Sequence, residues 1–254
     1  MGLIRMGKRV KKEPVYQRET QFLSVLSRGI PFAYVEAYKA LRTNLEFVSS
    51  VNGVKSIVVT SALPAESKST TAINLAATLA KGGKSVILVE CDMRKPSLRK
   101  YLAVGRRQKG LSAILTANAG IEECIVEVEN MGIHVIHAGA IPPNPSELLN
   151  QERMKKLIET LKERYDYVIL DAPPAAVVTD AVIVGRMVDG VLLVVRSRFA
   201  PARTVRLVRQ RLESVNINIL GVVLTRFDEK RAGWRSGYQY GGYEYGDEQK
   251  WSKL

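Results

Sequence analysis

Short, continuous runs of branched apolar residues recur along the chain, each bounded by polar or turn-forming residues. A strand exposed on one side alternates between apolar and polar positions. These runs do not alternate, which is typical of parallel strands covered on both faces. The pattern predicts strands at residues 56–60, 85–90, 133–138, 167–170, 190–195 and 218–224.

Segments with helical periodicity precede the first of these strands and separate several of the others. Their apolar residues recur at three- and four-residue spacing, as on the buried face of a helix. Alternation of strands and helices indicates an α/β domain with a mainly parallel sheet and helices on both faces. The expected helices are residues 34–50, 68–82, 146–164, 179–188 and 201–215.

The two ends of the chain lack this alternation. Residues 1–30 show no sustained periodicity and are basic, which predicts an N-terminal arm. Near the other end, SGYQYGGYEYGDE holds four glycines and four tyrosines and has no aliphatic residue to pack. We therefore expect one α/β domain over residues 31–228 and a flexible, tyrosine-rich tail over residues 229–254.

Composition narrows the class of protein. Of the 254 residues, 46% are apolar and 25% are charged, as in globular proteins that need no disulfide framework. Two cysteines, Cys91 and Cys124, indicate a reducing compartment. No apolar run reaches the roughly 18 residues of a membrane helix, and the first residues lack a signal-peptide apolar stretch. We expect a cytoplasmic protein whose membrane contact is peripheral.

Positive charge is concentrated in three regions. The chain carries 38 basic and 25 acidic residues, a formal net charge of +13. Each basic region is either a solvated surface or a site that attracts phosphates, acidic peptides or an anionic membrane. These regions are residues 1–18, 94–109 and 196–211.

A candidate phosphate-binding loop follows the first predicted strand. Lys68 and Ser69 open a helix at the position where P-loop proteins present amides, a lysine and a hydroxyl to phosphates and magnesium. The match to G-x-x-x-x-G-K-S/T is imperfect, because Ala62 and Ser67 replace the two glycines and a Cβ opposes the torsions that glycine permits. The tripeptide Lys-Ser-Thr is common and is weak evidence by itself. The preceding strand and the nearby carboxylates are the features that predict a P-loop NTPase-type fold.

Carboxylates follow two predicted strands, where ligands gather in open α/β sheets. The spacing of Glu90 and Asp92 predicts that they point to the same side of a strand. Asp171 follows four apolar residues, so either a metal or a capping role explains it. Magnesium phosphate chemistry uses such hard oxygen ligands. Arg94 lies beside these acids and either pairs with Asp92 or binds a phosphate.

The motifs, in their order, resemble those of the bacterial tyrosine kinases of the Walker type. The likeness is to the separate cytoplasmic form found in Gram-positive exopolysaccharide and capsule systems. It implies an ATP- and Mg²⁺-dependent protein-tyrosine kinase that autophosphorylates its tyrosine cluster and regulates polysaccharide synthesis. It rests on EAYKALRTNLEF, PAESKST, VECDMRKP, GAIPPNPSELL, VILDAPP and the C-terminal tyrosines.

The resemblance also assigns roles to individual residues. The residues implied to bind the nucleotide are Pro64, Ala65, Glu66, Ser67, Lys68, Ser69, Thr70 and Arg94. The implied magnesium ligands are Ser69, Asp92 and Asp171. The implied catalytic residues are Lys68, Asp92, Asp171 and Glu90, the last standing where the family has a proton-accepting Asp. The implied phosphoacceptors are Tyr238, Tyr240, Tyr243 and Tyr245.

Subunit contacts and partners are implied in the same way. The family motif E-x-x-R-x-x-R reads Glu36, Lys39 and Arg42 here, on one helix face; ordinary solvated charge is the alternative. The implied partners are further copies in a ring, a membrane adaptor of the polysaccharide co-polymerase type and a cognate tyrosine phosphatase, without nucleic acid. The adaptor would hold the chain at the inner face of the plasma membrane.

Two other functions stay open. Ser67 and Glu90 depart from the family pattern, so the chain is alternatively a degenerate nucleotide-binding scaffold of the same system. Partitioning-type ATPases resemble this fold as well. Their phosphate loop carries a second lysine five residues before the main one, where this chain has Leu63, and they lack the Gly-Tyr tail.

Overall fold

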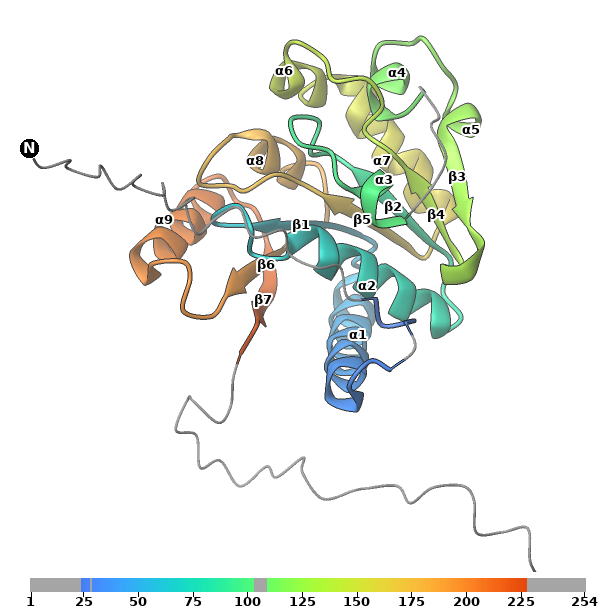
Figure 1. Ribbon diagram of the computed structural model, residues 1–254. Helices are drawn as coiled ribbons and strands as arrows, with labels where there is room; N and C mark the ends of the chain where they lie inside the picture. The colour runs from blue at the N-terminus through green and yellow to red at the C-terminus, as the bar shows by residue number, and fades with distance from the viewer. Residues whose placement is uncertain (1–23, 28, 103–108, 228–254) are drawn as a thin grey trace, which may run out of the picture.

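Within the described residues, seven strands form one sheet at the centre of the protein (Figure 1). The structure is a computed structural model that describes residues 24–27, 29–102 and 109–227. The four tail tyrosines and most of the predicted N-terminal arm lie outside the described residues. The strands are β1 (Ser56–Ser61), β2 (Val86–Glu90), β3 (Ile125–Val128), β4 (Ile133–Ile136), β5 (Tyr167–Asp171), β6 (Gly190–Arg196) and β7 (Ile219–Thr225).

The sheet is mainly parallel, with the order β3-β4-β2-β5-β1-β6-β7. Every neighbouring pair is parallel except β3 and β4. All of the predicted strands are present, so the predicted α/β fold is confirmed. Only β3 was not predicted, because its four residues lie at the sheet edge and are mostly half-buried, without a continuous apolar run.

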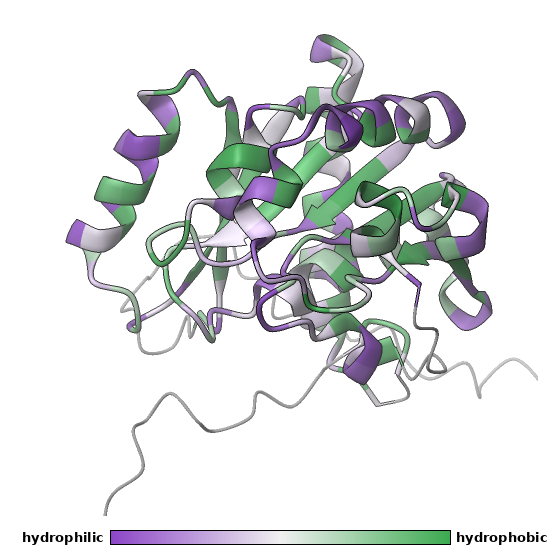
Figure 2. Cartoon of the chain, turned by 90° about the horizontal axis from the view of Figure 1, so that it is seen from above, coloured by the Kyte–Doolittle hydropathy of each residue, from purple (hydrophilic) through white to green (hydrophobic). Residues whose placement is uncertain are grey.

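Helices cover both faces of the sheet, as predicted. Around the apolar strands, the helices show hydrophilic residues on their outer sides (Figure 2). On one face the core is shared with α1 (Phe32–Asn52), α2 (Lys68–Lys81) and α3 (Leu98–Leu102). The opposite face packs against α4 (Leu111–Leu115), α5 (Ile121–Cys124), α6 (Pro145–Leu149), α7 (Glu152–Arg164), α8 (Asp180–Gly185) and α9 (Ala202–Glu213). A 3₁₀ turn, η2 (Glu129–Met131), joins β3 to β4.

The predicted helix at residues 146–164 is two helices. Helix α6 ends at Leu149, and α7 begins at Glu152 after the extended residue Gln151. The break separates the PPNPSELL segment from the amphipathic α7. It therefore lets α6 approach the end of the sheet while α7 lies against it.

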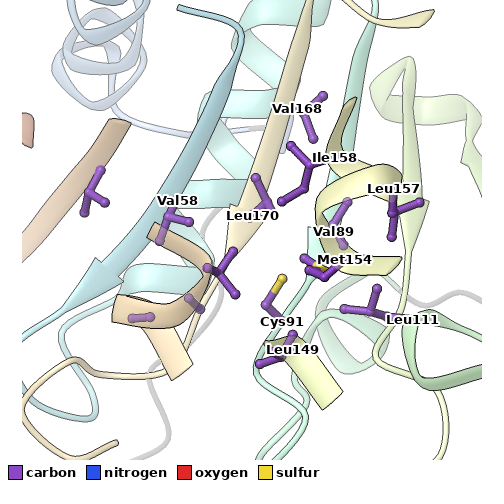
Figure 3. Packing of buried hydrophobic residues seen from close by; sticks show 14 of the residues in the cluster. Val58, Val89, Cys91, Leu111, Leu149, Met154, Leu157, Ile158, Val168 and Leu170 are labelled. Carbon is purple, nitrogen blue, oxygen red and sulfur yellow. The ribbon is translucent and has the colours of Figure 1, made fainter. Parts of the chain in front are cut away.

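The core between α7 and the sheet holds the end of β5 in place. Met154 and Ile158 lie one helical turn apart and pack with Val168 and Leu170 of β5 (Figure 3). Burial of each such side chain contributes roughly 1.5–3 kcal/mol. Cys91 belongs to the same cluster, and burial raises the pKa of its thiol well above the usual value. Cys91 is therefore a packing residue of this core.

The carboxyl ends of β1, β5 and β2 meet at one edge of the sheet. Their parallel register sets Val59 and Glu90 beside Asp171. Loops from three distant parts of the sequence therefore converge at this edge. No helix in the described part of the chain is both long and apolar enough to cross a membrane.

Candidate functional site

The loop between β1 and α2 contains two residues in the left-handed backbone region. Ala65 has φ +64° and Ser67 has φ +71°. Side chains with a Cβ pay roughly 1–2 kcal/mol in this region, whereas glycine does not. The predicted conflict between Ser67 and the loop torsions is therefore present. The strain at Ala65 was not predicted, because Ala65 occupies a position at which the P-loop motif accepts any residue.

Glu66 anchors the loop from the inside. Its carboxylate accepts the backbone N–H of Leu63 at 2.6 Å and that of Arg196 at 3.0 Å. The hydroxyl of Thr225 donates to the Glu66 carbonyl at 3.0 Å. The side chain of Glu66 is fully buried, so in this loop it faces the protein. Only its backbone is left for the predicted nucleotide contact.

Helix α2 starts at Lys68. The backbone N–H groups in the first turn of a helix have no hydrogen-bond acceptor within that helix. These groups and the positive end of the helix dipole favour an anion. Ser69 and Thr70 lie in this first turn and are both buried. The predicted loop residues therefore lie together between the end of β1 and the first turn of α2. Pro64 lies in the same connection between β1 and α2.

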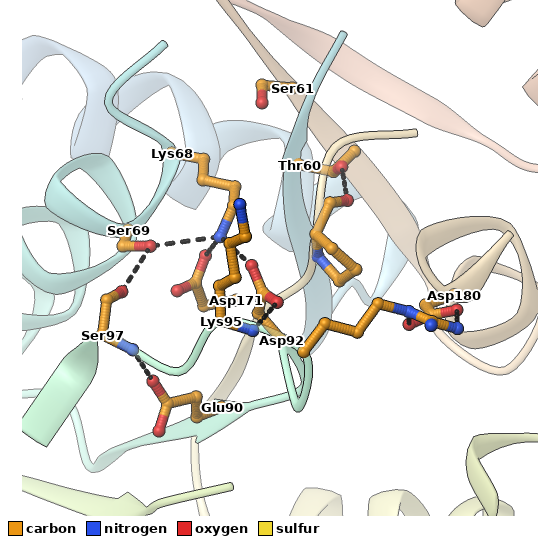
Figure 4. A network of polar contacts seen from close by, with 12 residues as sticks. Thr60, Ser61, Lys68, Ser69, Glu90, Asp92, Lys95, Ser97, Asp171 and Asp180 are labelled. Atoms are coloured by element: carbon orange, nitrogen blue, oxygen red, sulfur yellow. Dashed lines mark hydrogen bonds and ion pairs between the residues drawn. The ribbon is translucent and has the colours of Figure 1, made fainter. Parts of the chain in front are cut away.

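Lys68 sits between two carboxylates (Figure 4). Its Nζ lies 3.0 Å from Asp92 Oδ2 and 3.3 Å from Asp171 Oδ1. It also donates to Ser69 Oγ at 3.2 Å. Burial lowers the pKa of Lys68, but the charges of Asp171 and Asp92 outweigh it and raise that pKa overall. The lysine is therefore charged at the place where P-loop proteins bind terminal phosphates.

Asp171 is the most deeply buried acid of this cluster. It lies at the end of β5 and is inaccessible to solvent. Burial raises its pKa to about 6, although the charge of Lys68 opposes this. Its Oδ2 is buried and has no hydrogen-bond partner in the described structure. A buried acceptor without a partner is costly, which agrees with a ligand at this point.

A magnesium ion fits these residues. Within the described residues no group of three or more His, Cys, Asp or Glu could hold a metal. Magnesium usually takes only one or two carboxylates and completes its shell with water and substrate phosphates. Asp92 and Asp171 supply two carboxylates, and Ser69 a hydroxyl, around one point. When bound, the ion would neutralise negative charge on the phosphates.

Glu90 does not point into this cluster, and the expectation that it shares a side with Asp92 is wrong. Strand β2 ends at Glu90, so the two-residue strand period does not extend to Asp92. The Glu90 carboxylate accepts the N–H groups of Ser97 at 2.5 Å, Leu98 at 2.7 Å and Ala138 at 3.1 Å.

The electrostatic environment of Glu90 follows from these contacts. Burial raises its pKa, but His137 and the three amides outweigh burial and lower it. The carboxylate thus joins the start of α3 to the end of β4. By hydrogen bonds it is linked to the cluster through Ser97, whose Oγ donates to Ser69 Oγ at 3.2 Å, and its charge also contributes to the raised pKa of Asp171.

Arg94 pairs with Asp180 rather than with Asp92. Its Nε and one terminal nitrogen donate to the two Asp180 oxygens at 2.9 and 3.1 Å. The same terminal nitrogen donates to Ser146 Oγ at 2.7 Å. Asp180 is fully buried, so the guanidinium compensates a buried charge. This pair fastens the PPNPSELL segment, which contains Ser146, to the loop after β2.

The predicted subunit-contact residues lie on α1, away from the phosphate loop. Glu36 and Lys39 form an ion pair of 2.7 Å. Arg42 is partly buried and donates to the carbonyl of Thr78 on α2 at 3.3 Å. Only the first two therefore face outward together. The predicted phosphoacceptors Tyr238, Tyr240, Tyr243 and Tyr245 lie outside the described residues.

The fold and these contacts define a P-loop nucleoside triphosphatase-type protein. Residues 54–217 match a protein family described as an AAA domain. The structure of "The septum site-determining protein MinD complexed with Mg-ADP" from Pyrococcus horikoshii is similar, with a TM-score of 0.58 and 23% identity. It covers 67% of this chain and 69% of its own, and at this identity the likeness concerns the fold alone.

Proteins with higher sequence identity to this chain identify its family. The tyrosine-protein kinase YwqD of Bacillus subtilis is 36% identical over 82% of this chain and 86% of its own length. The tyrosine-protein kinase etk of Escherichia coli is 34% identical over 85% of this chain, which spans only 30% of that protein. The solved kinase domain of Escherichia coli ETK is 36% identical with a TM-score of 0.73, covering 78% of this chain and 81% of that one. The chain belongs to the bacterial tyrosine-protein kinases.

Proposed function

We propose that the protein transfers the terminal phosphate of ATP to tyrosine hydroxyls, with Mg²⁺, and that its targets include Tyr238, Tyr240, Tyr243 and Tyr245. The observation that carries this proposal is the position of Lys68. A charged, partly buried lysine lies within 3.3 Å of two carboxylates at the end of a phosphate loop. This arrangement combines a phosphate ligand with metal ligands, which phosphoryl transfer requires.

In this proposal the protein mainly positions charges. The phenol oxygen bonds to the terminal phosphorus as the bond from phosphorus to the bridging oxygen breaks, and ADP leaves. Lys68 would hold the terminal phosphates, while Ser69, Asp92 and Asp171 would hold the metal. Both Glu90 oxygens already accept N–H groups. Both Asp92 oxygens are also occupied, one by the backbone N–H of Lys95 and the other by Lys68. Proton transfer from the phenol to Glu90 or to Asp92 therefore requires that carboxylate to release one of its contacts.

The partners follow from family membership and are part of the proposal. We infer that the kinase acts in capsule or exopolysaccharide synthesis, assembles with further copies through the outward Glu36–Lys39 surface, and is activated by a membrane adaptor. A cognate phosphatase would reverse the modification. The adaptor would place the chain at the inner face of the plasma membrane.

A nucleotide-binding scaffold is the second candidate, because Ala65 and Ser67 are both strained in the loop. Labelled ATP with Mg²⁺ separates the two functions. A kinase yields stable label on tyrosine, and an adaptor tail peptide increases it. A scaffold binds ATP with the same stoichiometry but leaves every tyrosine unlabelled.

A further inference from the structure

Helix α9 carries four of the six arginines in the basic region of residues 196–211, and the proposed chemistry uses none of these four. The region contains no acidic residue. One side of α9 packs on the sheet through Val208 and Leu212, which are both buried in the core. The helix lies at the β6–β7 end of the sheet, apart from α7 (Figure 1).

The side of α9 that points away from the sheet is basic and partly apolar. It consists of Arg203, Arg206, Leu207 and Gln210, which we call the α9 face. These positions are spaced three or four residues apart around the helix, so they lie on one side of it. All four are exposed, and Leu207 is 55% exposed beside the arginines. Positive charge and apolar surface therefore lie next to each other.

The protein does not neutralise the two arginines of the α9 face. Among the residues that the structure describes, neither Arg203 nor Arg206 forms an ion pair through its side chain. The other two arginines of the helix have partners within the protein. Arg209 pairs with Glu213 at 3.2 Å, and Arg211 donates to a backbone carbonyl, also at 3.2 Å. The charges of Arg203 and Arg206 are therefore left for an anionic partner.

The edge strand β7, which contacts α9, adds apolar surface on the same side of the sheet. Val222 is paired with Leu193 of β6, and Leu224 with Val195. Paired residues of neighbouring strands point to the same face of a sheet. Leu193 lies in the core on the α9 side, so Val222 and Leu224 also point to that side. They are 59% and 48% exposed.

We propose that the α9 face binds the anionic lipid headgroups of a membrane surface directly, without the adaptor. The guanidinium groups of Arg203 and Arg206 would bind headgroup phosphates. Leu207 would enter the boundary between headgroups and acyl chains, with the arginine stems lying along apolar surface. The exposed leucine among the arginines favours lipid over nucleic acid. This lipid-binding surface goes beyond the proposed kinase function and does not depend on the phosphate site.

Co-sedimentation of the full-length protein with vesicles tests the surface in the absence of the adaptor and of ATP. Vesicles of phosphatidylcholine alone are compared with vesicles that also contain phosphatidylglycerol. The wild type should sediment only with the anionic vesicles, and less at higher salt because salt screens exposed charges. Each basic residue near an anionic surface strengthens binding about fivefold. The double variant Arg203→Gln, Arg206→Gln should therefore bind about 30-fold more weakly.

A matched control removes the same charge from another helix. Lys155 and Lys156 are exposed on α7, and the double variant Lys155→Gln, Lys156→Gln should bind the vesicles as the wild type does. Leu207→Gln should weaken binding about fivefold at every salt concentration, because it removes apolar surface and no charge. None of these variants touches the Lys68 cluster, so ATP binding and tyrosine phosphorylation should be unchanged in all of them.

A fluorescent label reports whether the α9 face itself meets the bilayer. The two natural cysteines are both buried, so Leu207→Cys provides one exposed thiol for a dye that is sensitive to its environment. The emission of this dye should shift to the blue with anionic vesicles. The same dye on Glu159→Cys, at an exposed position of α7, should show no shift.

The outcomes separate this inference from its alternatives. Equal losses of binding in the arginine and lysine variants would mean that net charge alone attracts the protein to the vesicles, and would overturn the proposal. Unchanged binding by the arginine variant would place the lipid contact elsewhere and would overturn it too. So would binding to double-stranded DNA or to a polyglutamate peptide, but not to vesicles, with the same dependence on Arg203 and Arg206.

The proposed kinase function is judged by a different readout. Failure of the wild type to bind anionic vesicles, with normal tyrosine phosphorylation, would overturn the lipid surface and leave the kinase function intact. Vesicle binding that depends on the α9 face, without phosphorylation of any tyrosine, would support the lipid surface and remove the kinase function alone.

Discussion

The carboxylate of Glu66 accepts the backbone N–H of Arg196 at 3.0 Å, which ties the phosphate loop to the end of β6. The same carboxylate also accepts the N–H of Leu63 within the loop. Two amides therefore depend on one fully buried side chain. The loop is held by the protein before any nucleotide arrives, which reduces the ordering that phosphate binding would otherwise require.

Replacing Glu66 by Ala should weaken both folding and ATP binding. Two buried N–H groups would lose their acceptor, at about 1–3 kcal/mol each. Chemical denaturation measures the stability, and isothermal titration measures the affinity. The conservative Glu66→Gln variant keeps one acceptor oxygen. Its stability and its ATP affinity should therefore lie between those of the wild type and those of Glu66→Ala. Unchanged stability of Glu66→Ala would show that the loop does not rely on this anchor.

Glycine at the two strained positions, 65 and 67, should stabilise the folded loop. In Ser67→Gly and Ala65→Gly, relief of the left-handed conformation is worth roughly 1–2 kcal/mol. The added entropy of the free loop costs roughly 0.5–1 kcal/mol. The net effect at each position is a stabilisation of at most about 1.5 kcal/mol, with ATP affinity equal or higher. Weaker ATP binding in both variants would show that the side chains themselves are needed in this loop.

Glu90→Gln separates a structural from a proton-accepting role. The new amide nitrogen would face an N–H donor, either at Ala138 or at the start of α3. The free energy of unfolding should therefore fall by about 1–3 kcal/mol. If Glu90 instead accepts the phenol proton, turnover collapses while the melting temperature stays that of the wild type. Thermal melts and single-turnover phosphorylation on the same sample decide between these outcomes.

Asp189 makes the stability depend on pH. Its carboxylate accepts the N–H groups of Lys55 and Ser56 at 2.8 Å each, and Lys162 Nζ lies 2.6 Å away. Burial raises the pKa of Asp189, but these contacts outweigh burial and lower it. A carboxylate with a lowered folded-state pKa stabilises the fold above its unfolded pKa of about 3.9. That contribution is lost as the pH falls through the lower folded value.

Asp189→Asn should therefore lower the free energy of unfolding by about 1–2 kcal/mol at pH 7. The reduction should become progressively smaller below pH 4. Urea unfolding at several pH values gives the comparison. Glu213→Gln, at an exposed ion pair with Arg209, is the control and should change little at either pH. A stability difference for Asp189→Asn that does not shrink in acid would contradict the assignment.

Local patterns predicted much of the fold and part of the site. Apolar runs located the parallel strands, and the phosphate-loop motif located Lys68 and Ser69. The contacts of Arg94 and Glu66 were not predictable, because their partners Asp180 and Arg196 are distant in sequence. The direction of the Glu90 side chain was predicted wrongly for another reason. Strand periodicity was extended past the end of β2, whereas the chain turns there and places Asp92 beside Lys68.

Phosphotyrosine formation by a folded Lys68→Met variant is the most direct test of the account. Met retains the apolar stem but removes the charge that lies between Asp92 and Asp171. The variant and the wild type are each incubated with labelled ATP, Mg²⁺ and an adaptor tail peptide, after circular dichroism has shown equal folding. We predict label on tyrosine in the wild type and a loss of at least about 100-fold in the variant. Undiminished tyrosine labelling by the folded variant would contradict the assignment of this cluster as the phosphoryl-transfer site.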